Sequence, residues 1–338
     1  MSEVQPSFRI KRKAALSPAE YVEGILSGNR TVLSRAITLV ESQRAEHQAI
    51  AEEVVSACIR HSGKSIRIGI TGVPGVGKST FIEAFGLSLI EAGRRVAVLA
   101  IDPTSQKSKG SILGDKTRME KLATHEHAFI RPSPSSGSLG GIAPKTREAM
   151  LLCEAAGYNA ILVETVGVGQ SEIAVHSMTD FFLLLMLAGA GDELQGIKRG
   201  IMEMADLIAI NKADGANRDK ARLAQQEYQH ALHFFPPHPN GWRPRTLTCS
   251  ALTGEGIVEI REVIFEFEKK MSKNGWIERQ RTEQASYWLR QALEHELLSR
   301  FYASEQVKAK LPELDAAVRK GEISPLRAAK ALLKLLPQ

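Results

Sequence analysis

Residues 66–79 read Ile66-Arg67-Ile68-Gly69-Ile70-Thr71-Gly72-Val73-Pro74-Gly75-Val76-Gly77-Lys78-Ser79. A short run rich in β-branched residues leads here into a glycine-rich turn, and a helix is predicted from Lys78 onward. The turn matches the pattern G-x-x-x-x-G-K-[ST], and a strand before it and a helix after it are the context in which that pattern binds phosphate. Glycines let the backbone wrap closely around phosphate oxygens, and the helix N-terminus adds converging N–H groups. This stretch therefore predicts a phosphate-binding P-loop.

The residues of this loop have different expected roles. Lys78 is expected to reach the β- and γ-phosphates of a nucleotide, and the Ser79 hydroxyl is expected to coordinate Mg²⁺. The expected nucleotide contacts of the loop are Gly72, Val73, Pro74, Gly75, Val76, Gly77, Lys78, Ser79 and Thr80.

Predicted strands recur after this motif and alternate with predicted helices. The strands are expected at 66–71, 96–101, 160–164, 180–187, 206–211 and 245–250, and the helices at 78–92, 143–156, 219–234 and 256–271. Several strands are apolar at nearly every position, as expected of strands that helices cover on both faces. This alternation predicts an α/β fold of the P-loop NTPase type, with a mostly parallel central sheet and right-handed crossovers.

Helices are predicted on both sides of this region. Ser17-Pro18-Ala19-Glu20 is a capping box, and apolar residues recur at helical spacing from Val32 to Val40. Beyond about Asn274 the strand pattern stops, and helices are expected at 282–303 and 305–336, the last of them restarting at Ser324-Pro325. We therefore predict an N-terminal helical extension (1–62), a nucleotide-binding domain (63–275) and a C-terminal helical arm (276–338). The apolar side of the final helix must be buried on the chain's own core or on another subunit.

A second motif indicates which base is bound. Asn211-Lys212-Ala213-Asp214 directly follows an expected strand. The Asp214 carboxylate is able to accept hydrogen bonds from both the ring N–H and the exocyclic amine of guanine, whereas adenine would leave that charge unpaired. The Lys212 stem is expected to cover the base, and the Ala251 N–H is expected to meet guanine O6. The expected guanine contacts are Asn211, Lys212, Asp214, Ser250, Ala251 and Leu252, and GTP is favoured over ATP.

The hydrolytic residues follow a less common pattern. Glu164-Thr165-Val166-Gly167 ends a predicted strand at the place where small GTPases carry D-x-x-G. Glu164 is expected to hold Mg²⁺ through a water molecule, and the Gly167 N–H is expected to contact the γ-phosphate. Val168 follows where Ras-like proteins place a water-orienting glutamine. We therefore expect intrinsic hydrolysis to be slow and to depend on a partner.

Two further loops complete the expected site. Asp102, which ends the second strand, and Asp115 are candidate metal or water ligands, although Asp115 has helix capping as an alternative role. Residues 105–117 are expected to form a first switch. In the glycine-rich loop 188–200, Lys198 is expected to make a nucleotide-dependent charge contact, the alternative being a solvated lysine. The expected catalytic set is Lys78, Asp102, Asp115, Glu164, Gly167 and Lys198, and the expected metal set is Ser79, Asp102, Asp115 and Glu164.

Composition limits the other classes of function. Basic residues outnumber acidic ones by 44 to 38, but they are spread thinly and aromatic residues make up only 6% of the chain, so we expect no nucleic-acid partner. The most apolar run, 181–190, is about half the length that crosses a bilayer, so we expect no membrane insertion. The N-terminal residues do not resemble a secretion signal, and the three cysteines form no disulfide or metal-binding pattern. We therefore expect a cytoplasmic location.

At these residues the chain resembles the G3E family of P-loop GTPases, whose name marks the glutamate found here as Glu164. The resemblance covers nearly the whole chain and is carried by Thr71–Thr80, Asp102-Pro103-Thr104-Ser105, Glu164-Thr165-Val166-Gly167-Val168-Gly169-Gln170-Ser171-Glu172 and Asn211–Asp214. The long glutamate motif is similar to that of the bacterial GTPase chaperones of methylmalonyl-CoA mutase, a group within the G3E family.

This resemblance implies several properties beyond the fold. It implies a homodimer built largely through the C-terminal arm, and a complex with the adenosylcobalamin-dependent methylmalonyl-CoA mutase. In that complex, GTP binding and hydrolysis would gate cofactor loading and protect the mutase from inactivation. The resemblance also supports the assignment of these motifs to phosphate, Mg²⁺ and guanine, and it implies that the loop around Lys198 is a third switch. We expect cobalamin to belong to the mutase, because the sequence has no D-x-H-x-x-G signature.

Three other functions share parts of this pattern. A metallochaperone GTPase of the nickel-insertion kind would need a surface of His and Cys ligands, and only His125-Glu126-His127 clusters here. A protein-targeting GTPase would need a Met-rich amphipathic domain, and the eight methionines are spread along the chain. A small-molecule kinase would need an acceptor site with a base near the γ-phosphate, and no further motif indicates one.

Overall fold

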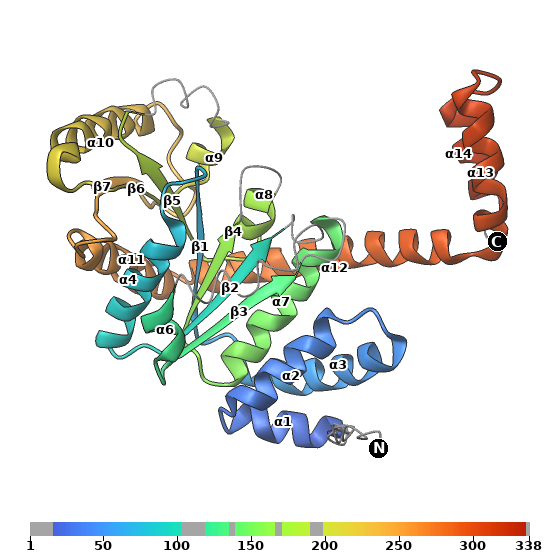
Figure 1. Ribbon diagram of the computed structural model, residues 1–338, viewed down its shortest axis with the longest axis horizontal. Helices are drawn as coiled ribbons and strands as arrows, with labels where there is room; N and C mark the ends of the chain where they lie inside the picture. The colour runs from blue at the N-terminus through green and yellow to red at the C-terminus, as the bar shows by residue number, and fades with distance from the viewer. Residues whose placement is uncertain (1–15, 103–118, 135–138, 166–170, 190–198, 336–338) are drawn as a thin grey trace, which may run out of the picture.

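The computed structural model describes residues 16–102, 119–134, 139–165, 171–189 and 199–335 of the 338-residue chain. Within these ranges, seven strands form one parallel sheet in the order β3-β2-β4-β1-β5-β6-β7 (Figure 1). The strands are β1 (Ile66–Gly72), β2 (Val96–Asp102), β3 (Ala128–Pro134), β4 (Ala160–Thr165), β5 (Phe181–Leu187), β6 (Leu207–Asn211) and β7 (Arg245–Thr248). The expected α/β fold with a parallel central sheet is confirmed.

Strand β3 was not among the expected strands. It contains Pro132 and Pro134, which have no backbone N–H to give to a ladder and therefore argue against a strand in the middle of a sheet. In the structure β3 pairs with β2 at the end of the strand order, where the missing donors are tolerated. The other six strands lie where the sequence predicts them, with ends shifted by one or two residues.

Two apolar cores lie on opposite faces of the sheet. On one face, β1 contributes Ile66, Ile68 and Ile70, and the covering helices are α4 (Lys78–Glu91), α6 (Glu120–Thr124), α9 (Arg199–Glu203), α10 (Arg218–Leu232) and α11 (Ile257–Lys273). On the other face, β2 and β4 contribute Leu99 and Val163, which pack with α7 (Leu139–Ala155) and α8 (Ser171–His176). Strand β1 places Arg67, Gly69 and Thr71 on this second face. The central strand β1 is therefore apolar on one side and polar or small on the other.

The N-terminal helices pack on this second core. They are α1 (Pro18–Leu26), α2 (Arg30–Glu41) and α3 (Ala45–Cys58), and buried Leu33, Ile37 and Val54 belong to the same apolar cluster as Leu99 and Val163. The predicted capping box is confirmed, because Ser17 and Glu20 exchange backbone-to-side-chain hydrogen bonds of 2.7 and 3.3 Å. The N-terminal helices thus share a core with the sheet.

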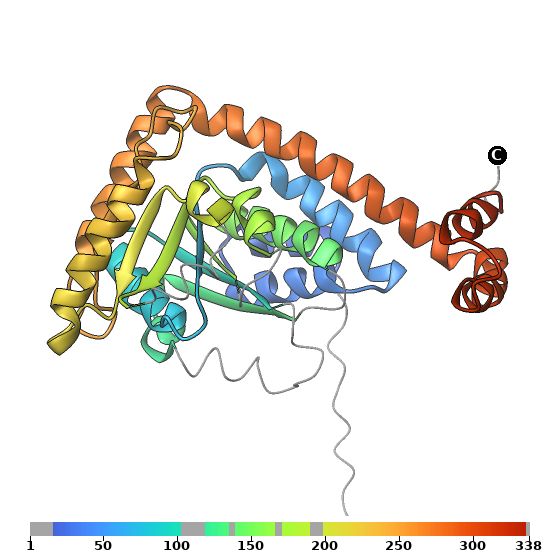
Figure 2. The same cartoon turned by 90° about the horizontal axis from the view of Figure 1, so that it is seen from above.

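The C-terminal helices leave the body of the molecule. They are α12 (Trp276–Ala303), α13 (Glu305–Arg319) and α14 (Pro325–Leu333). The first half of α12 packs on the body through buried Ile277 and Trp288, and its second half extends away from it (Figure 2). Helix α12 begins six residues before the expected position 282, directly after Gly275, whose φ of +69° favours glycine. No helix in the described part of the chain is long and apolar enough to span a membrane.

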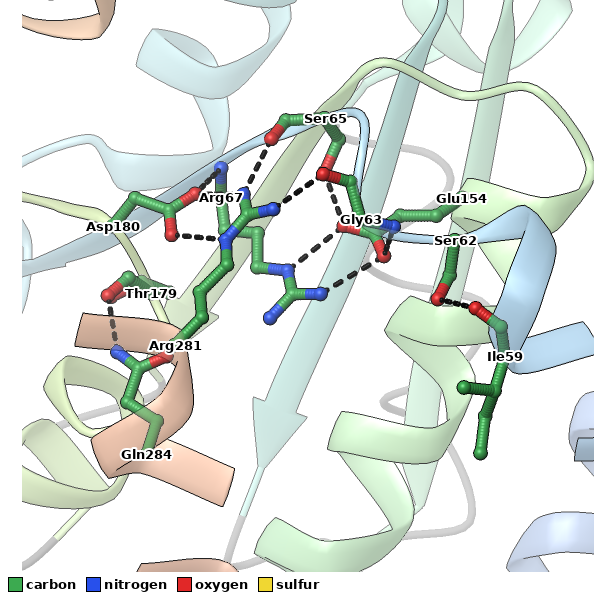
Figure 3. Close-up of polar contacts among 10 residues, drawn as sticks. All are labelled: Ile59, Ser62, Gly63, Ser65, Arg67, Glu154, Thr179, Asp180, Arg281 and Gln284. Atoms are coloured by element: carbon green, nitrogen blue, oxygen red, sulfur yellow. Dashed lines mark hydrogen bonds and ion pairs between the residues drawn. The ribbon is translucent and has the colours of Figure 1, made fainter. Parts of the chain in front are cut away.

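A buried charge network holds the start of α12 against the sheet (Figure 3). The Arg281 guanidinium donates to Asp180 at 2.6 and 2.8 Å and to the carbonyl oxygen of Ser65 at 2.6 Å. The Arg67 guanidinium donates twice to Glu154 at 2.9 Å, and the Arg67 backbone N–H donates to Asp180 at 2.8 Å. The network therefore joins α12, α7 and the beginnings of strands β1 and β5.

Substitution of Arg281 by alanine is expected to lower the free energy of unfolding by about 3 kcal/mol, because it leaves the buried Asp180 carboxylate without its cation. Denaturant unfolding followed by circular dichroism measures this value. The exposed Arg290 of the same helix is the matched control, and its alanine variant should unfold like the wild type. Equal unfolding free energies for both variants would mean that the network does not stabilise the docked helix.

Candidate functional site

The P-loop spans residues 72–79, between the end of β1 and the first turn of α4. Gly75 and Gly77 have φ of +77° and +91°, values that side-chain-bearing residues rarely adopt. At Gly72 the reason for glycine is space, since an added Cβ would lie 2.5 Å from the Leu185 carbonyl oxygen of neighbouring β5. The loop is thus held close to the carboxyl end of the sheet, where nucleotides bind in folds of this type.

Lys78 lies folded over this loop. Its Nζ donates to the carbonyl oxygens of Gly72 at 2.9 Å and of Val73 at 3.4 Å. Burial lowers the pKa of Lys78, while the charges of Glu164 and Glu172 act in the opposite direction. The ammonium group is therefore half-buried in a region where two carboxylates favour its charged form.

Glu164 stands at the carboxyl end of β4, beside β1. It is 5% exposed and in register with Ile70 of β1. One residue later, the Thr165 hydroxyl donates to the Thr71 hydroxyl at 2.8 Å, which ties the ends of the two strands together. The strand that carries the glutamate is therefore fixed directly beside the strand that leads into the P-loop.

The oxygen donors at this edge have the chemistry that Mg²⁺ prefers. Ser79 supplies a hydroxyl in the first turn of α4, Glu164 supplies a carboxylate, and Asp102 ends β2, the other neighbour of β4. Asp115, Gly167 and Lys198, which the sequence also predicts to act here, lie outside the described residues.

Asn211 links three loops at the carboxyl edge of the sheet. Its buried amide Nδ2 donates to the Val76 carbonyl oxygen of the P-loop at 2.8 Å. Its Oδ1 accepts from the Ala251 backbone N–H at 3.1 Å. The expected guanine contacts Asn211 and Ala251 are thus bonded to each other, and Asn211 links the P-loop to the loop that begins at Ser250.

The other residues of the expected guanine motif lie together. The Ser250 hydroxyl donates to the Asp214 carboxylate at 2.5 Å, and the Thr253 backbone N–H donates to the same hydroxyl at 3.2 Å. Lys212 adopts φ of +59°, and its Nζ donates to the Gly75 carbonyl oxygen at 2.8 Å, so its stem crosses from the guanine motif to the P-loop. Leu252 is 82% exposed at the tip of the loop. The structure therefore brings the two motifs together as the sequence predicts.

Glu172 is the site residue that the sequence prediction missed. It lies in the first turn of α8, is 1% exposed, and is near enough to Lys78 for its charge to affect the pKa of that lysine. Buried carboxylates are rare unless they have a partner. The signal available in the sequence was its place eight residues after Glu164, at the start of a helix, where an acidic side chain is favoured.

Among the described residues, no group of three or more His, Cys, Asp and Glu side chains has the arrangement of a metal site. His125 and His127, the only cluster that the sequence offers for a metallochaperone, have ring centroids 5.7 Å apart. Their side chains lie on the segment that leads into β3.

Comparison with known proteins identifies the family. The family model described as methylmalonyl Co-A mutase-associated GTPase MeaB matches residues 33–306. The GTPase ArgK of Escherichia coli is 47% identical over 94% of this chain and 96% of that protein. The mitochondrial methylmalonic aciduria type A homolog of Mus musculus is 45% identical over 92% of this chain and 77% of that protein.

A solved structure shares the fold over almost the whole length. The crystal structure described as LAO/AO transport system kinase superposes with a TM-score of 0.74 at 41% identity, over 94% of this chain and 96% of that one. Family model, relatives and solved structure all cover most of this chain and agree with its P-loop GTPase fold. The chain therefore belongs to the MeaB family of methylmalonyl-CoA mutase-associated GTPases and is itself a P-loop GTPase.

Proposed function

We propose that this GTPase is a chaperone of the adenosylcobalamin-dependent methylmalonyl-CoA mutase, which gates cofactor loading and protects the mutase from inactivation by binding and hydrolysing GTP. The observation that supports binding of a guanine nucleotide is the pair of Asn211 hydrogen bonds. These bonds join the P-loop to the Ser250–Leu252 loop beside Asp214. The family match supports the choice of client.

In this proposal, phosphate binding changes the partners of Lys78. In the structure its ammonium group donates to two P-loop carbonyl oxygens. On GTP binding it exchanges them for β- and γ-phosphate oxygens, which carry full negative charge and accept stronger hydrogen bonds. Backbone N–H groups of residues 72–80 and the N-terminus of α4 hold the same phosphates. Lys78 then stabilises the charge that develops as the γ-phosphate leaves.

Guanine is read by a single carboxylate in this proposal. Asp214 accepts from the ring N–H and the exocyclic amine of the base, while the Ser250 hydroxyl keeps the carboxylate oriented. Lys212 covers the base with its stem, and Ala251 lies at guanine O6. Because adenine has no matching pair of donors, binding ATP would leave the carboxylate unpaired.

We also propose that Ser79, Asp102, Asp115 and Glu164 hold Mg²⁺, either directly or through water. When bound, the cation would neutralise charge on the phosphate oxygens. The residue that follows Gly167 is Val168, which has no polar group to orient the attacking water. We therefore propose that intrinsic hydrolysis is slow, and that contacts with the mutase, with Lys198 in a nucleotide-dependent switch, complete the catalytic arrangement.

The GTP hydrolysis rate should rise at least about tenfold when methylmalonyl-CoA mutase is added at saturating concentration, a decrease of about 1.4 kcal/mol in the activation barrier. Phosphate release under single-turnover conditions measures the rate, with the mutase alone as the control. An equal hydrolysis rate with and without the mutase would indicate that this GTPase acts on another client, which would contradict the chaperone proposal.

We propose that two copies of this chain form a dimer through the arm, residues 276–338. Helix α12 from Leu289 onward and helix α14 expose large apolar side chains: Leu289, Leu293, Leu297, Leu298, Tyr302, Leu326 and Leu333 are 55–67% exposed. Exposed apolar surface of this extent is typical of an interface.

Removal of residues 291–338 is expected to convert the dimer to a monomer while leaving the docked part of α12, including Trp288, in place. Sedimentation equilibrium measures the mass of each form. Removal of residues 325–338 alone, which keeps the leucines of α12, is the graded control and should weaken the dimer less. A dimer that survives the longer deletion would place the interface elsewhere.

A further inference from the structure

Helix α8 (Ser171–His176) lies between the nucleotide site and the C-terminal arm. Its first turn carries Glu172, and the segment after the helix, residues 177–180, contacts α12. The P-loop, α8 with residues 177–180, and α12 belong to three different parts of the sequence, and only the fold brings them together.

At the nucleotide end, α8 presents a buried carboxylate to the P-loop region. Burial lowers the pKa of Lys78, and Glu172, which is 1% exposed, carries a negative charge that partly opposes this lowering. Lys78 is the cation that must take up new partners when phosphates enter the loop. Because GDP has no γ-phosphate for Lys78 to contact, the electrostatic surroundings of Glu172 would differ between the GTP-bound and the GDP-bound site.

In the middle, α8 rests directly on the strand that leads into the P-loop. A Cβ added at Gly69 of β1 would lie 2.7 Å from Val175 Cγ1 and 2.9 Å from Thr179 Oγ1. Val175 is fully buried, and Thr179 is 1% exposed. Since Gly69 has no side chain, Val175 and Thr179 lie directly against the backbone of β1, and a displacement of the start of α8 would pass to residues 177–180.

At the other end, hydrogen bonds join this segment to the first half of α12. The Trp288 indole donates to the Ser177 carbonyl oxygen at 3.1 Å, and the Gln284 amide donates to the Thr179 carbonyl oxygen at 2.8 Å. Arg281 binds the carboxylate of Asp180, the last residue of the segment (Figure 3). Ser177, Thr179 and Asp180 thus carry most of the polar contact between this face and the arm.

The contact between residues 177–180 and the first half of α12, called the joint below, leaves polar groups without hydrogen-bond partners. Gln280 and Gln284 both donate to the Thr179 carbonyl oxygen, at 3.4 and 2.8 Å. Within the described residues, the amide oxygens of these two glutamines are buried without a hydrogen-bond partner. Buried acceptors without partners are unfavourable, so this packing is not the only arrangement that the two surfaces could favour.

We propose that α8 and residues 177–180 couple the nucleotide state to the docking of α12, so that exchanging GTP for GDP changes how firmly the arm is held to the body. This coupling rests on the proposed GTPase function, since it requires GTP and GDP to occupy the P-loop. Glu172 senses the occupancy of the P-loop, Gly69 allows the close contact that transmits the change, and Gln280, Gln284 and Trp288 receive it. Because such coupling is reciprocal, weakening the docking of α12 must change the relative affinities for the two nucleotides.

Hydrogen–deuterium exchange on the full-length wild type tests the forward direction. The protein is saturated with GDP or with a non-hydrolysable GTP analogue, each with Mg²⁺. Peptides covering residues 276–290 are expected to exchange at rates that differ at least about threefold between the two states. Peptides from α10, on the opposite face of the sheet, are expected to exchange equally in both states, because both nucleotides contain guanine.

The reverse direction is tested by titrating fluorescent GDP and GTP analogues into variants of the joint. Gln284→Ala and Trp288→Phe each remove one hydrogen bond to the segment and are expected to change the ratio of the two dissociation constants at least about threefold. The exposed Glu283 between them is the matched control, and Glu283→Ala should keep the wild-type ratio. Thermal unfolding shows whether each variant is folded.

The outcomes separate this inference from the function on which it rests. If the wild type binds neither nucleotide, the proposed nucleotide site itself is wrong. If it binds both but residues 276–290 exchange identically in the two states, the coupling is disproved. An unchanged ratio in folded Gln284→Ala and Trp288→Phe also disproves it, and the wild-type exchange data decide alone if neither variant folds.

Discussion

Replacement of Lys78 by alanine is expected to slow GTP turnover by about 10²–10³-fold, the effect typical of removing one group that stabilises developing charge. The Lys78 ammonium is the cation placed over the P-loop, where it donates to the Gly72 and Val73 carbonyl oxygens. Alanine leaves the γ-phosphate oxygens without this donor in a partly buried site, where an electrostatic contact is stronger than in water. Single-turnover hydrolysis with and without the mutase measures the loss.

The matched control for this prediction is Lys64, an exposed lysine that lies just before β1, the strand whose other end leads into the P-loop. Lys64→Ala removes the same charge just before the amino end of β1, at the opposite edge of the sheet, and it should hydrolyse GTP like the wild type. Wild-type turnover by Lys78→Ala would show that the phosphates are bound elsewhere and would remove the basis of the site described here.

Replacement of Asp214 by asparagine is expected to weaken GTP binding by about 10²-fold, because the hydrogen bond from the exocyclic amine is lost and the ring N–H keeps only a neutral acceptor, and a hydrogen bond to a charged group is worth about 1.5–3 kcal/mol. Asparagine offers a carbonyl oxygen that accepts from the ring N–H and an NH₂ group that donates to the carbonyl oxygen that xanthine carries in place of the amine of guanine. Binding of XTP should therefore improve while binding of GTP declines. Titration of both nucleotides into the same preparation measures the ratio of their dissociation constants.

The control for this substitution is Asp219→Asn, an equal change on the exposed first turn of α10, five residues further along the chain. It should leave the GTP-to-XTP ratio at the wild-type value. If Asp214→Asn also keeps that ratio, the base is recognised by other residues, and the Ser250–Asp214 hydrogen bond is structural only.

Where the sequence prediction succeeded, the information was local. The loop between β1 and α4 and six of the seven described strands are each contiguous runs, in which residue type sets the backbone conformation directly. Positive φ at Gly75 and Gly77 is one example, and the proline-started capping box at Ser17 is another. Strand β3 was missed because its prolines are read as strand breakers, and nothing local shows that the strand will lie at an edge.

By itself, the sequence determined that this chain is a P-loop GTPase, and it predicts which residues bind phosphate and guanine. Only the tertiary structure decided that Asn211 acts as a link between loops, that Glu172 is buried near Lys78, and that α8 is joined to the arm. The hydrogen bonds of that joint connect residues 105 and 111 positions apart. Contacts over such separations leave no periodicity in the sequence, because they depend on how the whole sheet and its helices pack rather than on the conformation of any one segment.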